Sequence, residues 1–247
     1  MDRLIYTSLT AMRGAQSRQA ATANNLANAQ TPGFRAEVAA AQALWLRGDG
    51  LESRAVASEE VIGADMRAGV VTETGRELDV AMQGDALMVI QADGGEEAYT
   101  RRGDLQLSPS GLLTNGDGQP VMGAQGPITL PPAEKVMIDS DGRISIVPVG
   151  GDPGQPQEVD HLRLVTAAGS KFVKGLDGLF RVRGGGILPD DPDARVLTGH
   201  IEGSNVSATA TLVEMIEASR SWDTQLKLIS SARDMDSAAA DLMRLPE

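Results

Sequence analysis

The chain of 247 residues carries 34 Asp and Glu against 22 Lys and Arg, so its formal net charge is −12. This excess of negative charge opposes binding to nucleic acid, whose phosphates require a cationic face. The absence of cysteine excludes disulfides and thiolate metal ligands. Aromatic residues make up only 3% of the chain, which leaves few rings for stacking on sugars or bases.

The first thirty residues predict an amphipathic helix. Apolar, Ala and Gln side chains recur there every seven residues, with no Pro before Pro32. Pro32 and Gly33 end the pattern because proline lacks an amide donor and glycine relaxes the backbone. We expect this stripe to form an assembly interface, and its members are Ile5, Leu9, Met12, Ala23 and Leu26.

The last forty residues predict a second, longer helix. No Pro or Gly occurs from Val206 to Leu245, and apolar residues again follow a heptad period. Thr211 and Glu214 have the spacing of a capping box, and Ser204 or Asn205 is a candidate N-cap. The expected interface members here are Leu212, Met215, Trp222, Leu226, Ile229 and Met243.

Between the helices, the hydrophobic period changes to two, which predicts β-strands from Leu78 to Gly199. Asp141-Gly142 separates two alternating apolar runs and predicts a hairpin, and Asn115-Gly116 and Asp177-Gly178 predict further turns.

The predicted fold class is therefore α+β, with a mostly-β body flanked by terminal helices that pair in a coiled-coil-like manner. The expected division is an N-terminal helix at 1–35, an extension of undetermined fold at 36–76, a β-rich body at 77–200 and a C-terminal helix at 201–247.

The two ends of the chain carry opposite charge and little apolar surface. Residues 1–47 have a net charge of +3 and residues 206–247 a net charge of −3, so the ends attract each other or the ends of neighbouring copies. Four large apolar side chains in the N-terminal stripe supply about 6–12 kcal/mol on full burial. Ordering each backbone residue costs about 1–2 kcal/mol. We therefore expect the helices to order among other copies, the alternative being a private helix pair within a monomer.

Four segments resemble the signatures of bacterial flagellar rod and hook axial proteins. Two lie in the body, at Leu78–Gly84 and at Tyr99–Gly103. The N-terminal signature includes Asn24, Asn25, Leu26, Ala27, Asn28, Thr31, Pro32, Gly33 and Phe34. The C-terminal signature includes Gly203, Ser204, Asn205 and Val206, and leads into Leu212–Ala218.

The resemblance implies a structural subunit of the flagellar basal-body rod, exported through the flagellar export machinery without a cleaved signal. Its implied partners are other rod subunits, its terminal helices pack in the inner layer of the rod, and it uses no cofactor. Gly63–Met66 is most similar to proximal-rod members. The run Asp85–Met88 departs from the Gly-Phe-Phe pattern common in the family, which weakens the alternative of a distal-rod or hook protein.

No pattern in the sequence predicts a catalytic, metal or cofactor site. His161 and His200 have no nucleophile signature beside them, and Asp139–Gly142 lacks the further ligands of a calcium loop. We interpret Asp190–Asp193 as a solvated acidic loop and Gly184–Gly186 as a flexible one. An enzyme or carbohydrate-binding β domain flanked by helices is the alternative from another class, and the scarcity of aromatic residues disfavours it.

Overall fold

The fold is known from a computed structural model that describes residues 2–45, 55–152, 154–167, 169–170, 172–175 and 177–243. It divides into two compact units. The helical unit comprises Met1–Ala27, Glu37–Gly63 and Ser207–Glu247, and the body unit comprises Asn28–Ala36 and Ala64–Val206. The predicted α+β class, with a helix at each end of a mostly-β body, is confirmed.

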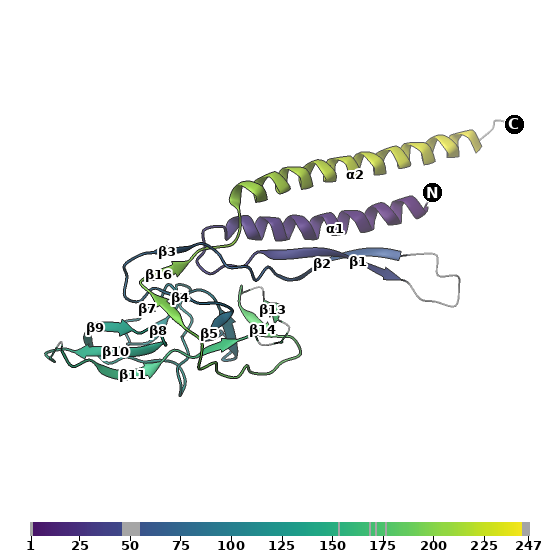
Figure 1. The fold of residues 1–247 in the computed structure, drawn as a ribbon. Helices are drawn as coiled ribbons and strands as arrows, with labels where there is room; N and C mark the ends of the chain where they lie inside the picture. The colour runs from purple at the N-terminus through teal and green to yellow at the C-terminus, as the bar shows by residue number, and fades with distance from the viewer. Residues whose placement is uncertain are drawn as a thin grey trace. The chain divides into compact units, whose positions relative to one another are not determined.

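The helical unit contains α1 (Asp2–Ala27), α2 (Ala208–Met243) and the paired strands β1 (Glu37–Trp45) and β2 (Ala55–Ala64). α1 packs against both α2 and β1, and the three lie side by side in Figure 1. Part of the extension at 36–76, whose fold the sequence does not predict, is thus the β1–β2 pair. Neither α1 nor α2 combines the length and the apolar character needed to cross a membrane.

The start of α2 corrects the predicted caps. Ser207 precedes the helix, and its side-chain oxygen accepts a bond from the Ala210 amide at 3.5 Å. The Thr211 hydroxyl donates to the Ser207 carbonyl at 2.9 Å, so Thr211 does not begin a capping box. Asn205 does not cap the helix either, because its side chain bonds within the body unit.

The body unit is built from short strands in several sheets. A five-stranded sheet has the order β12 (Leu164–Thr166), β5 (Ala86–Gln91), β6 (Glu97–Thr100), β14 (Phe180–Val182) and β13 (Phe172–Lys174). A three-stranded sheet has the order β11 (Gln157–His161), β10 (Arg143–Pro148) and β9 (Ala133–Ile138). Three pairs complete it: β7 (Gln106–Leu107) with β8 (Leu113–Thr114), β4 (Val80–Met82) with β15 (Val196–Thr198), and β3 (Val71–Glu73) with β16 (His200–Glu202).

The hairpin predicted around Asp141-Gly142 is confirmed. β9 and β10 are antiparallel, with Ile138 opposite Ile144 and Val136 opposite Ile146. The turn at Asp177-Gly178 is confirmed between the antiparallel strands β13 and β14. In the turn predicted at Asn115-Gly116, the Gly118 amide donates to the Asn115 carbonyl.

The body core is mainly aliphatic, as the scarcity of aromatic residues requires. Its larger cluster includes Met88, Ile90, Leu113 and Ile144, all fully buried. A smaller cluster holds three of the seven aromatic residues, where Phe172 makes edge contacts with both Tyr99 and Phe180 at centroid distances of 6.2 Å.

We predict that Ile90→Ala lowers the free energy of unfolding by about 2–5 kcal/mol, because it removes buried methyl groups and leaves a cavity. Ile187→Ala is the matched control, since Ile187 is 66% exposed and its loss should change stability by less than about 0.5 kcal/mol. Urea unfolding of the full chain measures both. Equal effects of the two substitutions would contradict this assignment of the core.

Candidate functional site

The family signatures at the two ends of the sequence meet in the body unit. We call the meeting place the junction, and it consists of residues 28–36, 65–70 and 199–206 together with Arg101. The Gly33 amide donates to the Glu202 carbonyl at 2.7 Å, and the Asn205 amide donates to the Phe34 carbonyl at 3.2 Å. Residues that are 169 and 171 positions apart in the chain are therefore held together by backbone bonds.

Gly33 is required at its position for two reasons. Its φ angle of 66° lies in the left-handed region that favours glycine. A side chain there would also place its Cβ only 2.3 Å from the Arg101 carbonyl. The Thr31-Pro32-Gly33 segment, which ends the predicted helix in the sequence, thus also brings the chain against the segment that follows β6.

Asn205 bonds to three different segments of the junction. Its Oδ1 accepts from the Ala36 amide at 2.7 Å. Its Nδ2 donates to the carbonyls of Asp65 and Arg67 at 2.8 and 2.9 Å. One side chain therefore fixes the segment leading from α1, the segment after β2 and the segment leading into α2.

Three charged side chains are buried at the centre of the junction, and we call them the Glu202 cluster: Arg35, Arg101 and Glu202. Their exposed fractions are 2%, 3% and 1%. Glu202 Oε1 lies 2.5 Å from Arg35 Nη1, and Oε2 lies 2.6 Å from Arg101 Nη2. The Gly69 amide also donates to Oε1 at 2.8 Å. The carboxylate is thus contacted by three segments that are distant in sequence.

Arg101 extends the cluster into β4 and β5. Its Nη1 donates to the carbonyls of Gly84 and Ala86, and its Nη2 donates to the carbonyl of Met82. Burial lowers the pKa of Arg101, while the adjacent Glu202 carboxylate raises it and so favours the charged form. Arginine remains charged in this setting, because its ordinary pKa lies far above neutral pH.

Arg35 depends on Glu202 more completely than Arg101 does. In the described part of the chain, Arg35 Nε is buried with no hydrogen-bond acceptor. On the other side of the segment, Lys174 Nζ donates to the Arg35 carbonyl at 2.9 Å and lies 3.5 Å above the Phe34 ring. Phe34 and Arg35 are therefore held from two directions within the body.

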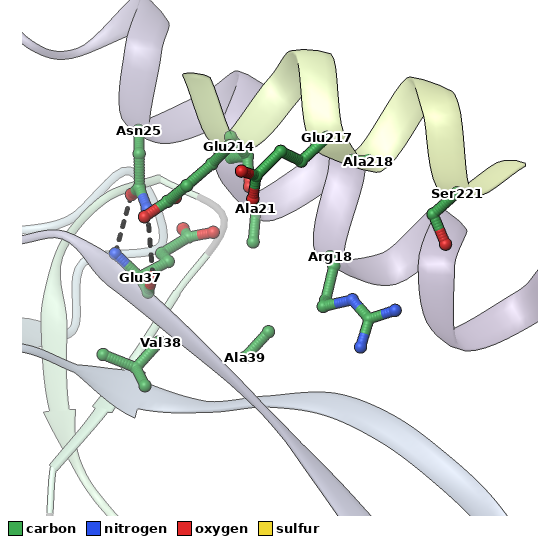
Figure 2. Close-up of a pocket in the computed structure, with 11 residues that line it drawn as sticks. Arg18, Ala21, Asn25, Glu37, Val38, Ala39, Glu214, Glu217, Ala218 and Ser221 are labelled. Carbon is green, nitrogen blue, oxygen red and sulfur yellow. Dashed lines mark hydrogen bonds between the residues drawn. The ribbon is translucent and has the colours of Figure 1, made fainter. Parts of the chain in front are cut away.

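In the helical unit, Asn24 and Asn25 hold the start of β1. Asn25 exchanges two bonds with the Glu37 backbone, at 2.7 and 3.0 Å, and Figure 2 shows both. Asn24 Nδ2 donates to the Glu37 carboxylate at 2.6 Å. These bonds form one wall of a shallow groove of about 490 Å³ between α1, α2 and β1, which is also lined by Arg18, Glu214 and Glu217 (Figure 2).

The remaining residues of the family signatures lie in the turns next to these contacts. Thr31 bonds to Asn28 through both its amide and its hydroxyl, which closes the turn after α1. The Val206 amide donates to Ser204 Oγ at 3.2 Å, and the Gly203 amide donates to the Val70 carbonyl at 2.9 Å. Leu26 is half-buried and Ala27 is exposed at the end of α1.

The predicted interface residues that the structure describes are either half-buried or exposed. Met12, Leu26, Met215, Trp222 and Ile229 are half-buried. Ala23, Leu9, Leu212 and Leu226 are exposed, the three leucines by 43–46%. The side chains of Ile5 and Met243 lie outside those described.

Among the α1 positions whose burial the structure describes, residues 9–27, the buried ones are small: Gly14, Ala15 and Ala21. Small side chains allow the backbones of α1, α2 and β1 to approach closely. The larger apolar residues of the stripe are half-buried, as at Met12 and Leu26, or exposed, as at Leu9. Helix packing within the chain therefore leaves part of the apolar surface of the stripe uncovered.

Sequence reasoning did not select Arg35, Arg101 or Glu202 as site residues. The available signal was the position of two opposite charges inside the family signatures, each beside glycine and apolar residues. Arg102, the neighbour of Arg101, has a side chain that is 17% exposed and pairs with Asp104 and Asp117. Among the described residues, no cluster of three His, Asp or Glu side chains has the arrangement of a metal site.

The described residues form one unit that contains the two terminal helices and another in which the segments following α1 and preceding α2 meet. Three family models match the chain: "Flagella basal body rod protein" at residues 5–35, "Flagellar hook protein FlgE/F/G D1 domain" at residues 81–146, and "Flagellar basal body rod FlgEFG protein C-terminal" at residues 197–242.

Similar full-length relatives are named as flagellar basal-body rod proteins. The flagellar basal-body rod protein FlgF of Escherichia coli K12 is 41% identical, and that of Salmonella typhimurium LT2 is 40% identical; each alignment covers 99% of this chain and the whole relative. The flagellar basal-body rod protein FlgG of Bacillus subtilis is 30% identical over 99% of this chain and the whole relative. The chain belongs to the flagellar basal-body rod protein family, within the FlgF type, and it is a structural subunit of the flagellar basal body. The predicted resemblance to proximal-rod members is confirmed.

We predict that Asn205→Ala lowers the free energy of unfolding by about 1–3 kcal/mol, because the Ala36 amide and two carbonyls lose their partner. Arg67→Gln is the control, since it removes only a surface ion pair with Asp65 and should cost less than about 1 kcal/mol. Urea unfolding measures both. Wild-type stability of Asn205→Ala would contradict the role given to this side chain.

Proposed function

We propose that this rod subunit joins its neighbours through the outward faces of α1 and α2, and that it is not an enzyme. The observation that supports this proposal is the exposed apolar stripe of the helical unit. On α2 it comprises Leu212, Ile216 and Leu226, which are 43%, 53% and 46% exposed and lie on one side of the helix. Relatives named as basal-body rod proteins support assembly with other rod components.

The energy of such a contact is modest for each residue and adds up along the helix. Full burial of a Leu or Ile side chain contributes about 1.5–3 kcal/mol, so each half-exposed residue would contribute about 1 kcal/mol. Several such residues on α2, together with Leu9 on α1, repeated at each subunit, would drive addition to a growing rod. A single isolated contact of this size would be weak, which favours assembly on an existing rod over dimerisation in solution.

The charges of the two helices complement this contact. α1 carries three arginines and one aspartate, a net charge of +2, and α2 carries six carboxylates and three basic residues, a net charge of −3. Placing α1 of one subunit against α2 of another is therefore favoured over pairing two copies of the same helix. Such a contact joins two different surfaces, so it repeats into an open helical assembly and not a closed dimer.

The partners that we propose are other flagellar rod proteins and, on the family resemblance, the flagellar export machinery. A rod subunit needs neighbours on two sides, and the outward faces of two helices provide two surfaces. The full-length relatives named FlgF are 40–41% identical and the one named FlgG is 30% identical, which disfavours the predicted alternative of a distal-rod or hook-type protein. The scarcity of aromatic residues disfavours the other alternative, a helix-flanked enzyme or carbohydrate-binding module.

We predict that Leu226→Asp leaves the purified subunit folded but reduces its recovery in basal bodies at least about tenfold, since a charge replaces an apolar contact. The assay expresses the variant in cells that lack the wild-type copy and quantifies the subunit in purified basal bodies.

Val149→Asp is the matched control, because Val149 is 68% exposed in the body unit and outside the helical faces. It should be recovered at the wild-type level. Recovery of Leu226→Asp at that level, with normal motility, would show that the stripe on α2 is not an assembly surface.

A further inference from the structure

The strand pairing divides the body into two parts. One part has all of its strands between residues 86 and 182, and the other also needs strands near the end of the body, at residues 196–202. The five-stranded sheet, the three-stranded sheet and the β7–β8 pair use only residues between 86 and 182. β3 and β4 lie earlier in the chain, but in the described residues they pair with β16 and β15, which lie at 196–202. The N-terminal segment 28–36 also bonds to residues 202–205.

The Glu202 cluster adds an electrostatic condition to this strand order. Arg35 and Arg101 are buried side by side with Glu202, and Glu202 is the carboxylate that contacts both of them. Without it, two guanidinium groups would be buried with no anion between them, which is strongly unfavourable. The burial of Arg35 and Arg101 therefore depends on a residue that follows Arg101 by 101 positions.

We propose that the Glu202 cluster makes closure of the body conditional on the last strands of the chain. In this account the sheets between residues 86 and 182 form a core unit that folds first. Segment 28–36, β3 and β4 form a closure unit that docks only when β15, β16 and Glu202 are in place. The chain is synthesised from its N-terminus. The segment that follows α1 and the segment that precedes α2 are therefore not brought together until most of the chain is present.

This proposal goes beyond rod assembly, because it concerns the order in which one subunit closes. Its consequence in the native state is that the closure unit opens independently of the core unit and at lower free energy. The closure unit is reported by three backbone amides: Gly33, which donates to Glu202; Thr74, which donates to Gly199; and Gly203, which donates to Val70. The core unit is reported by the amides of Val89, Leu113 and Met122, which donate to Arg163, Ile128 and Val89.

The test is native-state hydrogen exchange of the full chain carrying Glu202→Gln, a change that keeps the side-chain shape and removes the charge. We expect exchange at Gly33, Thr74 and Gly203 to accelerate by at least about 100-fold, because a buried ion pair is broken. Exchange at Val89, Leu113 and Met122 should accelerate by less than about threefold, since those bonds belong to the core unit.

Glu77→Gln is the matched control. It removes the same charge from a surface pair with Lys135, in which both side chains are half exposed, and it should leave both sets of amides unchanged. Arg35→Met is the second variant. It leaves Arg101 and Glu202 as a balanced pair, so we expect the same closure amides to accelerate, by about tenfold.

Equal acceleration of the two sets of amides, in either Glu202→Gln or Arg35→Met, would overturn the proposal, because it would show that the body closes as one unit. Unchanged exchange at Gly33 and Gly203 in both variants would also overturn it, because closure would then not depend on the cluster. If Glu202→Gln does not fold, the comparison in Arg35→Met decides between these outcomes.

Discussion

The structure depends on one buried carboxylate. Glu202 is 1% exposed and balances two guanidinium groups, that of Arg35 beside the N-terminal signature and that of Arg101 in the segment after β6. Arg101 in turn fixes the turn between β4 and β5 through three carbonyls. A surface ion pair of this geometry contributes at most about 1 kcal/mol, whereas removing one partner of a buried pair costs about 3–5 kcal/mol. Burial of the charges therefore holds the junction more strongly than it holds a surface pair such as Arg143 with Asp141.

In the helical unit, small residues of α1 are buried within the subunit, whereas large apolar residues of α2 are exposed. Gly14, Ala15 and Ala21 are buried in the helix that packs on α2 and β1, so close approach needs no large side chain. Leu212, Ile216 and Leu226 are exposed, and in our proposal assembly buries them. A helix that buried its whole apolar stripe internally would have no apolar surface left for a neighbour.

Sequence reasoning predicted the elements that local chemistry controls. The two terminal helices, the β9–β10 hairpin and the turn between β13 and β14 follow from period and turn residues. It did not predict β1 and β2, nor that Leu107 would be 40% exposed while Leu105 is fully buried, because strand pairing and exposure are set by tertiary contacts. The predicted cap at Ser204 or Asn205 was wrong because of such tertiary contacts. Asn205 has a side chain suited to capping, but three long-range hydrogen bonds engage it. The family signatures located the junction in sequence, yet nothing local indicates that Arg35 and Glu202 share a site across 167 residues.

The central claim is that the Arg35–Glu202 contact joins the two ends of the chain, and a double-mutant cycle tests it most directly. The cycle measures the free energy of unfolding of the wild type, Arg35→Met, Glu202→Gln and the double variant. Our account predicts a coupling energy of at least about 1.5 kcal/mol, as found for close charge pairs that are removed from water. A coupling energy below about 0.5 kcal/mol, the value expected for independent sites, would contradict it.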